Sequence, residues 1–99
     1  MDTPSKLIET EADRLLAGLD LDDDADIDRA RLRLTAYIDA ADAIRAEAAD
    51  RLARFGPEDP RTVDMVRLAH IKLDIHLAAT NRVRAHLGLP IDPAPEPGG

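Results

Sequence analysis

The segment Gly56-Pro57-Glu58-Asp59-Pro60 separates two long helical patterns, and it decides the fold. Gly56 favours the end of the first helix, and Pro57 cannot continue that helix. Asp59 followed by Pro60 combines a good helix N-cap with proline at the first helical position. Because the connection is short, the two helices must lie side by side and antiparallel. We therefore predict a helical hairpin folded at this turn.

The helix predicted before the turn, over residues 26–55, repeats an apolar side chain at alternating steps of three and four. The repeat consists of Ile27, Ala30, Leu34, Tyr37, Ala41, Ile44 and Ala48, and Phe55 continues it. This heptad spacing keeps one stripe of side chains against a partner helix. Its partner is predicted over residues 60–87 and is ended by Gly88. Antiparallel pairing sets residues whose numbers sum to about 115 opposite each other, so the seam includes Leu34 opposite Thr80 and Tyr37 opposite Leu77.

A shorter helix, predicted over residues 4–18, precedes the hairpin. Thr3 can cap its first turn, and Pro4 fits the first helical position. The chain of 99 residues has the length of one domain, so we expect a single all-α domain over residues 1–89. Four prolines follow in residues 90–99, where we expect a disordered Pro-rich tail.

The composition excludes several classes of function. The chain has no Cys, so it has no disulfide scaffold, zinc knuckle or thiol nucleophile. Only 2% of the residues are aromatic, and the net charge is −7, which together disfavour nucleic-acid binding. No phosphate-binding glycine loop or nucleophile motif occurs. We therefore expect no catalytic activity and no cofactor. We find no apolar run at the N-terminus and no apolar run long enough to span a membrane. Both observations favour a cytoplasmic protein.

The apolar surface exceeds what one hairpin can bury. A helix over residues 4–18 is too short to cover a hairpin about 45 Å long, and monomers rarely leave such a stripe exposed. We therefore predict a homodimer in which two hairpins form a four-helix-type bundle. The expected oligomer interface combines a second stripe on the helix after the turn with small residues on the helix before it: Leu68, Ile71 and Ile75, with Ala36 and Ala40.

Antiparallel pairing also gathers basic side chains at the open end of the hairpin, opposite the turn. This basic pole consists of Arg29, Arg31, Arg33, Arg82, Arg84 and His86. It predicts a docking point for an acidic protein segment or for nucleic acid. No aromatic side chain is interleaved with the arginines to stack on bases, so an acidic partner is favoured. A structural interpretation is favoured over binding, because the acidic run Asp20–Asp28 lies beside the pole in the chain and can neutralise it.

Two patterns raise the question of a metal site. The acidic run Asp20–Asp28 has the spacing of a calcium loop, but Ala25 and Arg31 stand where an EF-hand needs Gly and a bidentate Glu. Asp39, Asp42 and the pair His70 and His76 could contribute to a site in the bundle, yet the chain has no Glu-x-x-His pair. We predict no bound metal at the histidines, and divalent-cation binding by the acidic run stays open.

These observations favour a non-catalytic protein that serves as an interaction, adaptor or assembly module and forms a homo-oligomer. The alternative is a regulator that binds an acidic partner or nucleic acid through the basic pole. A metal-binding helical bundle is a third hypothesis. No stretch of the sequence identifies a known family.

Overall fold

The computed structural model describes residues 3–91, with side chains described from residue 6 onward. It contains three helices: α1 (Thr3–Leu15), α2 (Asp24–Phe55) and α3 (Pro60–His86). The all-α class is therefore confirmed. The helix ends differ from the predicted ones by at most three residues, the largest difference being the earlier end of α1. Most of the predicted Pro-rich tail lies outside the described residues. No helix within residues 3–91 is long and apolar enough to span a membrane.

Local capping explains where the two long helices start and stop. The Asp23 side chain accepts a backbone N–H two residues further on and caps α2. Gly56 ends α2 with φ 83°, and its N–H bonds the carbonyl of Leu52. Only glycine adopts this region of φ without strain. Asp59 then caps α3, because its Oδ2 accepts hydrogen bonds from the backbone N and the Oγ1 of Thr62, both at 3.0 Å.

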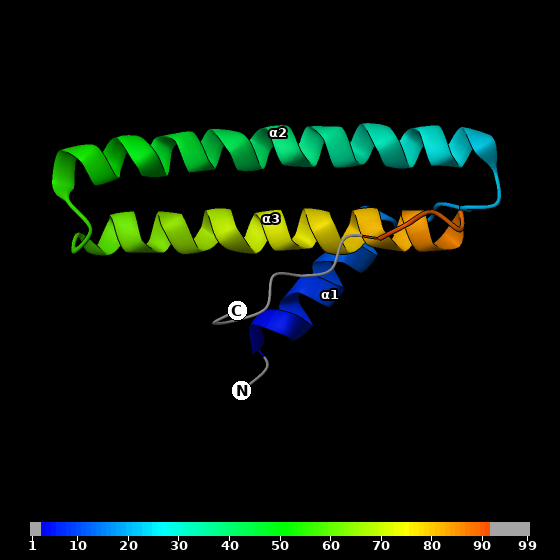
Figure 1. Ribbon diagram of the computed structural model, residues 1–99, viewed down its shortest axis with the longest axis horizontal. Coiled ribbons are helices and arrows are strands. Elements are labelled where there is room, and N and C mark those ends of the chain that lie inside the picture. The colour runs from blue at the N-terminus through cyan, green and yellow to red at the C-terminus, as the bar shows by residue number, and fades with distance from the viewer. Residues whose placement is uncertain (1–2, 92–99) are drawn as a thin grey trace.

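The predicted antiparallel hairpin is confirmed, since α2 and α3 pack along most of their length (Figure 1). Near the turn, Ala48 and Leu52 of α2 line a groove together with Val66 of α3. Near the open end, Ile27 of α2 shares a groove with Leu87 of α3. In each of these pairings the residue numbers sum to about 115, as the antiparallel pairing requires.

Small side chains dominate the buried positions. Among residues 6–91, six of the eight buried apolar residues are alanines: Ala12, Ala30, Ala41, Ala48, Ala69 and Ala79, beside Leu34 and Ile75. Alanine side chains allow the helix backbones to approach closely, but each buries little apolar area. The chain as a whole is elongated, with principal extents of 47 × 26 × 21 Å.

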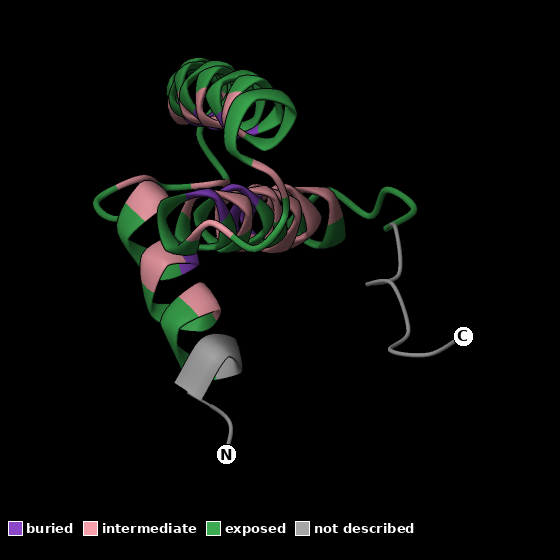
Figure 2. Ribbon diagram, turned by 90° about the vertical axis from the view of Figure 1, so that its left-hand side faces the viewer, coloured by how far each residue is buried: buried purple, intermediate pink, exposed green. Residues whose placement is uncertain are grey.

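Helix α1 lies across α3 at the open end of the hairpin and projects away from it (Figures 1 and 2). Its packing is led by Ala12, which joins Leu34 and Ala79 in a core cluster. Leu15 and Leu16 pack against this cluster from the end of α1. The half of the hairpin nearer the turn therefore has no third helix beside it (Figure 1).

Candidate functional site

The side chains of the basic pole gather at the open end of the hairpin, but they fall into two groups. Three of them, Arg33, Arg82 and His86, contact acidic or carbonyl groups of α1 and the α1–α2 connection, and a fourth, Arg29, pairs with Asp26 within α2. The other two, Arg31 and Arg84, line a groove between α2 and α3. Several side chains of the basic pole therefore contact other groups of the same chain.

Arg82 is the strongest link between α1 and the hairpin. Its guanidinium binds the carboxylates of Glu9 and Asp13, and Nη2 also lies 3.3 Å from the carbonyl oxygen of Glu9. Glu9 and Asp13 are one helical turn apart, so both point from the same face of α1. Burial lowers the pKa of Arg82, but the hydrogen bonds that it donates to these two carboxylates, together with their charge, outweigh this effect and raise the pKa overall. Sequence reasoning missed Glu9 and Asp13, because it assigned neutralisation of the pole to the acidic run alone.

The connection between α1 and α2 is held by further polar contacts. Arg33 donates Nη1 hydrogen bonds to the carbonyls of Leu15 at 3.1 Å and Ala17 at 2.9 Å, which satisfies the C-terminal end of α1. His86 Nε2 lies 2.7 Å from Asp22 Oδ1. These contacts fasten the segment after α1 to both long helices.

Asp26 organises the start of α2. Its Oδ2 accepts the backbone N–H of Asp20 at 2.8 Å, and its Oδ1 pairs with Arg29. The hydrogen bond from Asp20 and the pairing with Arg29 lower the pKa of Asp26. Within residues 3–91, no group of three or more His, Asp or Glu side chains is arranged to hold a metal ion. The acids described here cap backbone groups and pair with cations.

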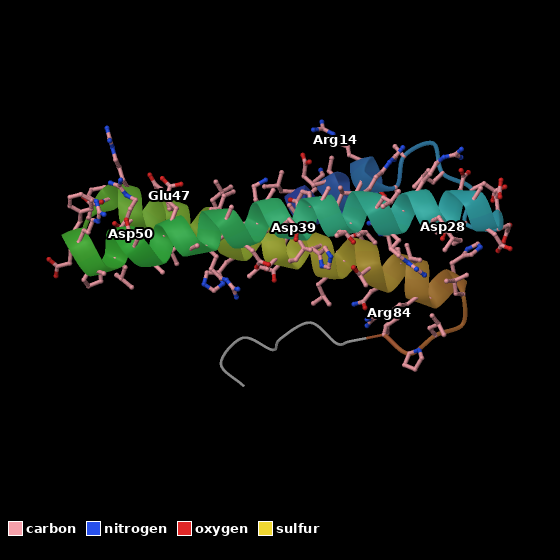
Figure 3. All side chains as sticks on the ribbon, turned by 90° about the horizontal axis from the view of Figure 1, so that it is seen from above. Arg14, Asp28, Asp39, Glu47, Asp50 and Arg84 are labelled. Carbon is pink, nitrogen blue, oxygen red and sulfur yellow. The ribbon has the colours of Figure 1, made fainter. Side chains whose placement is uncertain are left out.

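The second group of the pole borders a groove with a volume of about 430 Å³, here called the Arg31–Arg84 groove. Figure 3 shows Arg84 on the side of the hairpin away from α1. The hairpin register makes the groove a series of facing pairs, each formed by one α2 and one α3 residue. From the open end inward these are Ile27 with Leu87, Arg31 with Arg84, Thr35 with Thr80, and Ile38 with His76. Two arginines therefore share one level, and two threonines share the next.

Two polar features of the groove stand out. The Oγ1 of Thr80 is buried and has no hydrogen-bond partner among the described residues. The pKa of His76 is lowered, first by burial and also by the charge of Arg84, against an opposing effect of Asp42. His76 is consequently protonated less readily than an ordinary histidine.

The residues predicted for the oligomer interface divide as well. Leu68 is 44% exposed, Ile71 is half-buried, and Ala36 and Ala40 are exposed. Ile75 is only 3% exposed, so it belongs to the core of the single chain and has no surface to offer a second copy. Periodicity placed Ile75 in the second stripe correctly, but it did not show that the chain itself covers part of that stripe.

Comparison with protein families, with characterised proteins and with solved structures gives no match for this chain.

Proposed function

We propose that this chain is a non-catalytic interaction module that functions as a homodimer. The observation that carries the proposal is the open half of the second stripe on α3. Helix α1 packs against Ala78 and Ala79 of that stripe, whereas Leu68 stays 44% exposed nearer the turn. An apolar stripe that extends beyond the helix covering it is typical of a surface that packs against another molecule.

The shape of the chain supports a partner. The surface area is 7037 Å², whereas a compact monomer of this mass exposes ~5,500 Å². The radius of gyration is 15.3 Å, against about 13 Å for a compact domain of this length. Packing two hairpins together would reduce this surplus area.

A second copy is the simplest occupant, because an isologous dimer pairs the same patch on both chains. The open half of α3 offers Leu68 and Ile71, and α2 offers the small residues Ala36 and Ala40. Small side chains let helices approach closely, and the larger ones fill the space between them. Two hairpins joined in this way would form the four-helix-type bundle expected from the sequence.

The mass in solution tests the proposal. Light scattering or sedimentation should give twice the 10.8 kDa of one chain. Leu68→Asp and Ile71→Asp should each yield folded monomers, because they place a charge in an apolar interface. Ala53→Asp, at an exposed position of α2, is the matched control and should remain dimeric. A wild-type mass of one chain, or dimers that persist in both stripe variants, would overturn the proposed interface.

Binding of an acidic partner or nucleic acid through the whole basic pole has less support. Arg29, Arg33, Arg82 and His86 already bind groups of this chain. Such a partner would have to compete with α1 and its connection for Arg33, Arg82 and His86, and with Asp26 for Arg29.

A further inference from the structure

We propose that the second stripe of α3 packs antiparallel against the same stripe of a second copy, and that α1 competes with this copy for Arg82. This pairing rests on the homodimer proposed above and gives it a register. Continued by one step at each end, the stripe alternates steps of four and three residues, as helix–helix seams do. It then consists of Asp64, Leu68, Ile71, Ile75, Ala78 and Arg82.

The residues along the stripe complement one another when its direction is reversed. In an antiparallel pair centred near residue 73, facing positions have numbers that sum to about 146. Asp64 of each copy then lies opposite Arg82 of the other, which places opposite charges at both ends of the contact. Leu68 lies opposite Ala78, so a large side chain meets a small one.

Other registers of the stripe set charged residues against unsuitable partners. The central layers of the proposed register pair Ile71 with Ile75. A shift by one heptad would set Asp64 opposite Ile75, and a shift in the other direction would set Arg82 opposite Ile71. Either shift would bury a charge against an apolar side chain, which is unfavourable. A parallel pair would place like charges together at each end.

Helix α1 stands in the way of this pairing. It packs against Ala78 at the open end of the hairpin. Its Glu9 and Asp13 carboxylates bind the guanidinium of Arg82. Asp64 is exposed near the turn, where no third helix lies beside the hairpin (Figure 1). A second copy can therefore reach Arg82 only when α1 moves away, and its Asp64 then replaces the two carboxylates of α1.

The contacts of α1 can be lost while the hairpin stays folded. Their apolar part is led by Ala12 with Leu15 and Leu16. The side chain of Arg82 is 30% exposed and that of Glu9 is 65% exposed, and ion pairs between exposed groups contribute little stability. Because Arg82 has a carboxylate partner in both states, its charge does not oppose the exchange.

Cysteine cross-linking tests the register, since the chain has no Cys of its own. A mixture of Leu68→Cys and Ala78→Cys chains should form a disulfide-linked dimer under a mild oxidant, because these positions face each other. Leu68→Cys alone is the matched control and should stay unlinked, because its two copies lie about 15 Å apart along the helix axis. Linking of the control instead of the mixture would overturn the register, and so would a dimeric mixture that does not link.

Glu9→Gln with Asp13→Asn tests the competition by α1, because it removes both carboxylates that bind Arg82 and leaves the stripe unchanged. Sedimentation should give a dimer dissociation constant at least fivefold lower than that of the wild type. Glu11→Gln with Asp50→Asn removes the same charge from residues that pair within their own helices, and should leave the constant unchanged. An unchanged or higher constant in Glu9→Gln with Asp13→Asn would overturn the competition.

Asp64→Asn should raise the dissociation constant several-fold, although it also makes the chain less acidic. An unchanged constant would show that Asp64 does not pair with the second copy. If the wild type and all these variants keep the mass of one chain, the homodimer itself is refuted together with this pairing. If the wild type is a dimer whose constant is the same in every variant, only the pairing and the competition by α1 are refuted.

Discussion

Arg82 of α3 binds the carboxylate of Asp13 in α1, although 69 positions separate the two residues in the sequence. The same guanidinium binds Glu9. The apolar contact of α1 is small, since it depends on Ala12 with Leu15 and Leu16. Hydrophobic burial by itself specifies position weakly, whereas a guanidinium that holds two carboxylates specifies both place and direction. Arg82 therefore decides where α1 lies on the hairpin.

Replacing Arg82 by Gln should loosen α1 and leave the hairpin folded. Partly exposed ion pairs contribute up to about 1 kcal/mol each, so we expect a modest loss of stability. Hydrogen exchange should show reduced protection confined to residues 3–15. High salt should produce a similar change in the wild type, because ions screen the pair. Arg67→Gln, at an exposed position of the same helix, should change neither readout, and equal protection of α1 in both variants would contradict the assignment.

Ile75→Ala should destabilise the single chain, because Ile75 is 3% exposed. Removing a large apolar side chain from a packed core costs about 2–5 kcal/mol. Leu68→Ala changes a position that is 44% exposed, so it should lower the free energy of unfolding much less. The two substitutions are compared in a monomeric variant such as Ile71→Asp. Urea denaturation in that monomeric background measures both changes. Equal losses at the two positions would show that Ile75 is not a core residue.

Stability should decline as the pH falls below about 6.5, the usual pKa of histidine. Burial lowers the pKa of His76 in the folded chain. In acid the unfolded chain therefore takes up a proton more readily than the folded chain, and protons favour unfolding. His76→Gln should make the melting temperature less dependent on pH between 7 and the lowered pKa. His70→Gln, at an exposed position of α3, should keep the wild-type dependence, and an unchanged profile in His76→Gln would refute this explanation.

Asp59 should give the turn a separate sensitivity to acid. The backbone N–H of Thr62, its hydroxyl and the charge of Arg51 lower the pKa of Asp59. A carboxylate with a lowered pKa stabilises the fold above its ordinary pKa of 3.8, and that stability is lost as the pH falls through the lowered value. Asp59→Ala should reduce the melting temperature at neutral pH, whereas Asp59→Asn should lose less, since Asn also caps helices well. Equal melting temperatures of the two variants at pH 7 would argue against the capping role of Asp59.

The parts of the fold that depend on local chemistry are readable in the sequence. Gly56 and Asp59 mark the turn because their effects act within a few residues of backbone. The heptad fixes the seam, and the pairing of Arg31 with Arg84 follows from the same register. The burial of Ile75 within the single chain was not predicted. An apolar stripe shows which face of a helix is apolar, but it does not show which element covers that face.

The position of α1 explains most of what sequence reasoning missed. Its angle on α3 is set by contacts between residues that are distant in the chain, such as Asp13 with Arg82. Nothing in the periodicity of either helix encodes that angle. The contacts of Arg33 and Arg82 with α1 and the segment after it follow from that position, and so became visible only in three dimensions.

The alanine-rich seam restricts how this protein can diverge. Ala41 and Ala79 are fully buried where helices meet, so a larger residue at either position has no space and must push neighbouring backbones apart. In a hairpin 47 Å long, separation at one level acts like a wedge and opens the levels next to it. Homologous chains should therefore vary freely on the outer face of α2 while their seam stays small, and a large residue on one helix should be accompanied by a smaller one opposite.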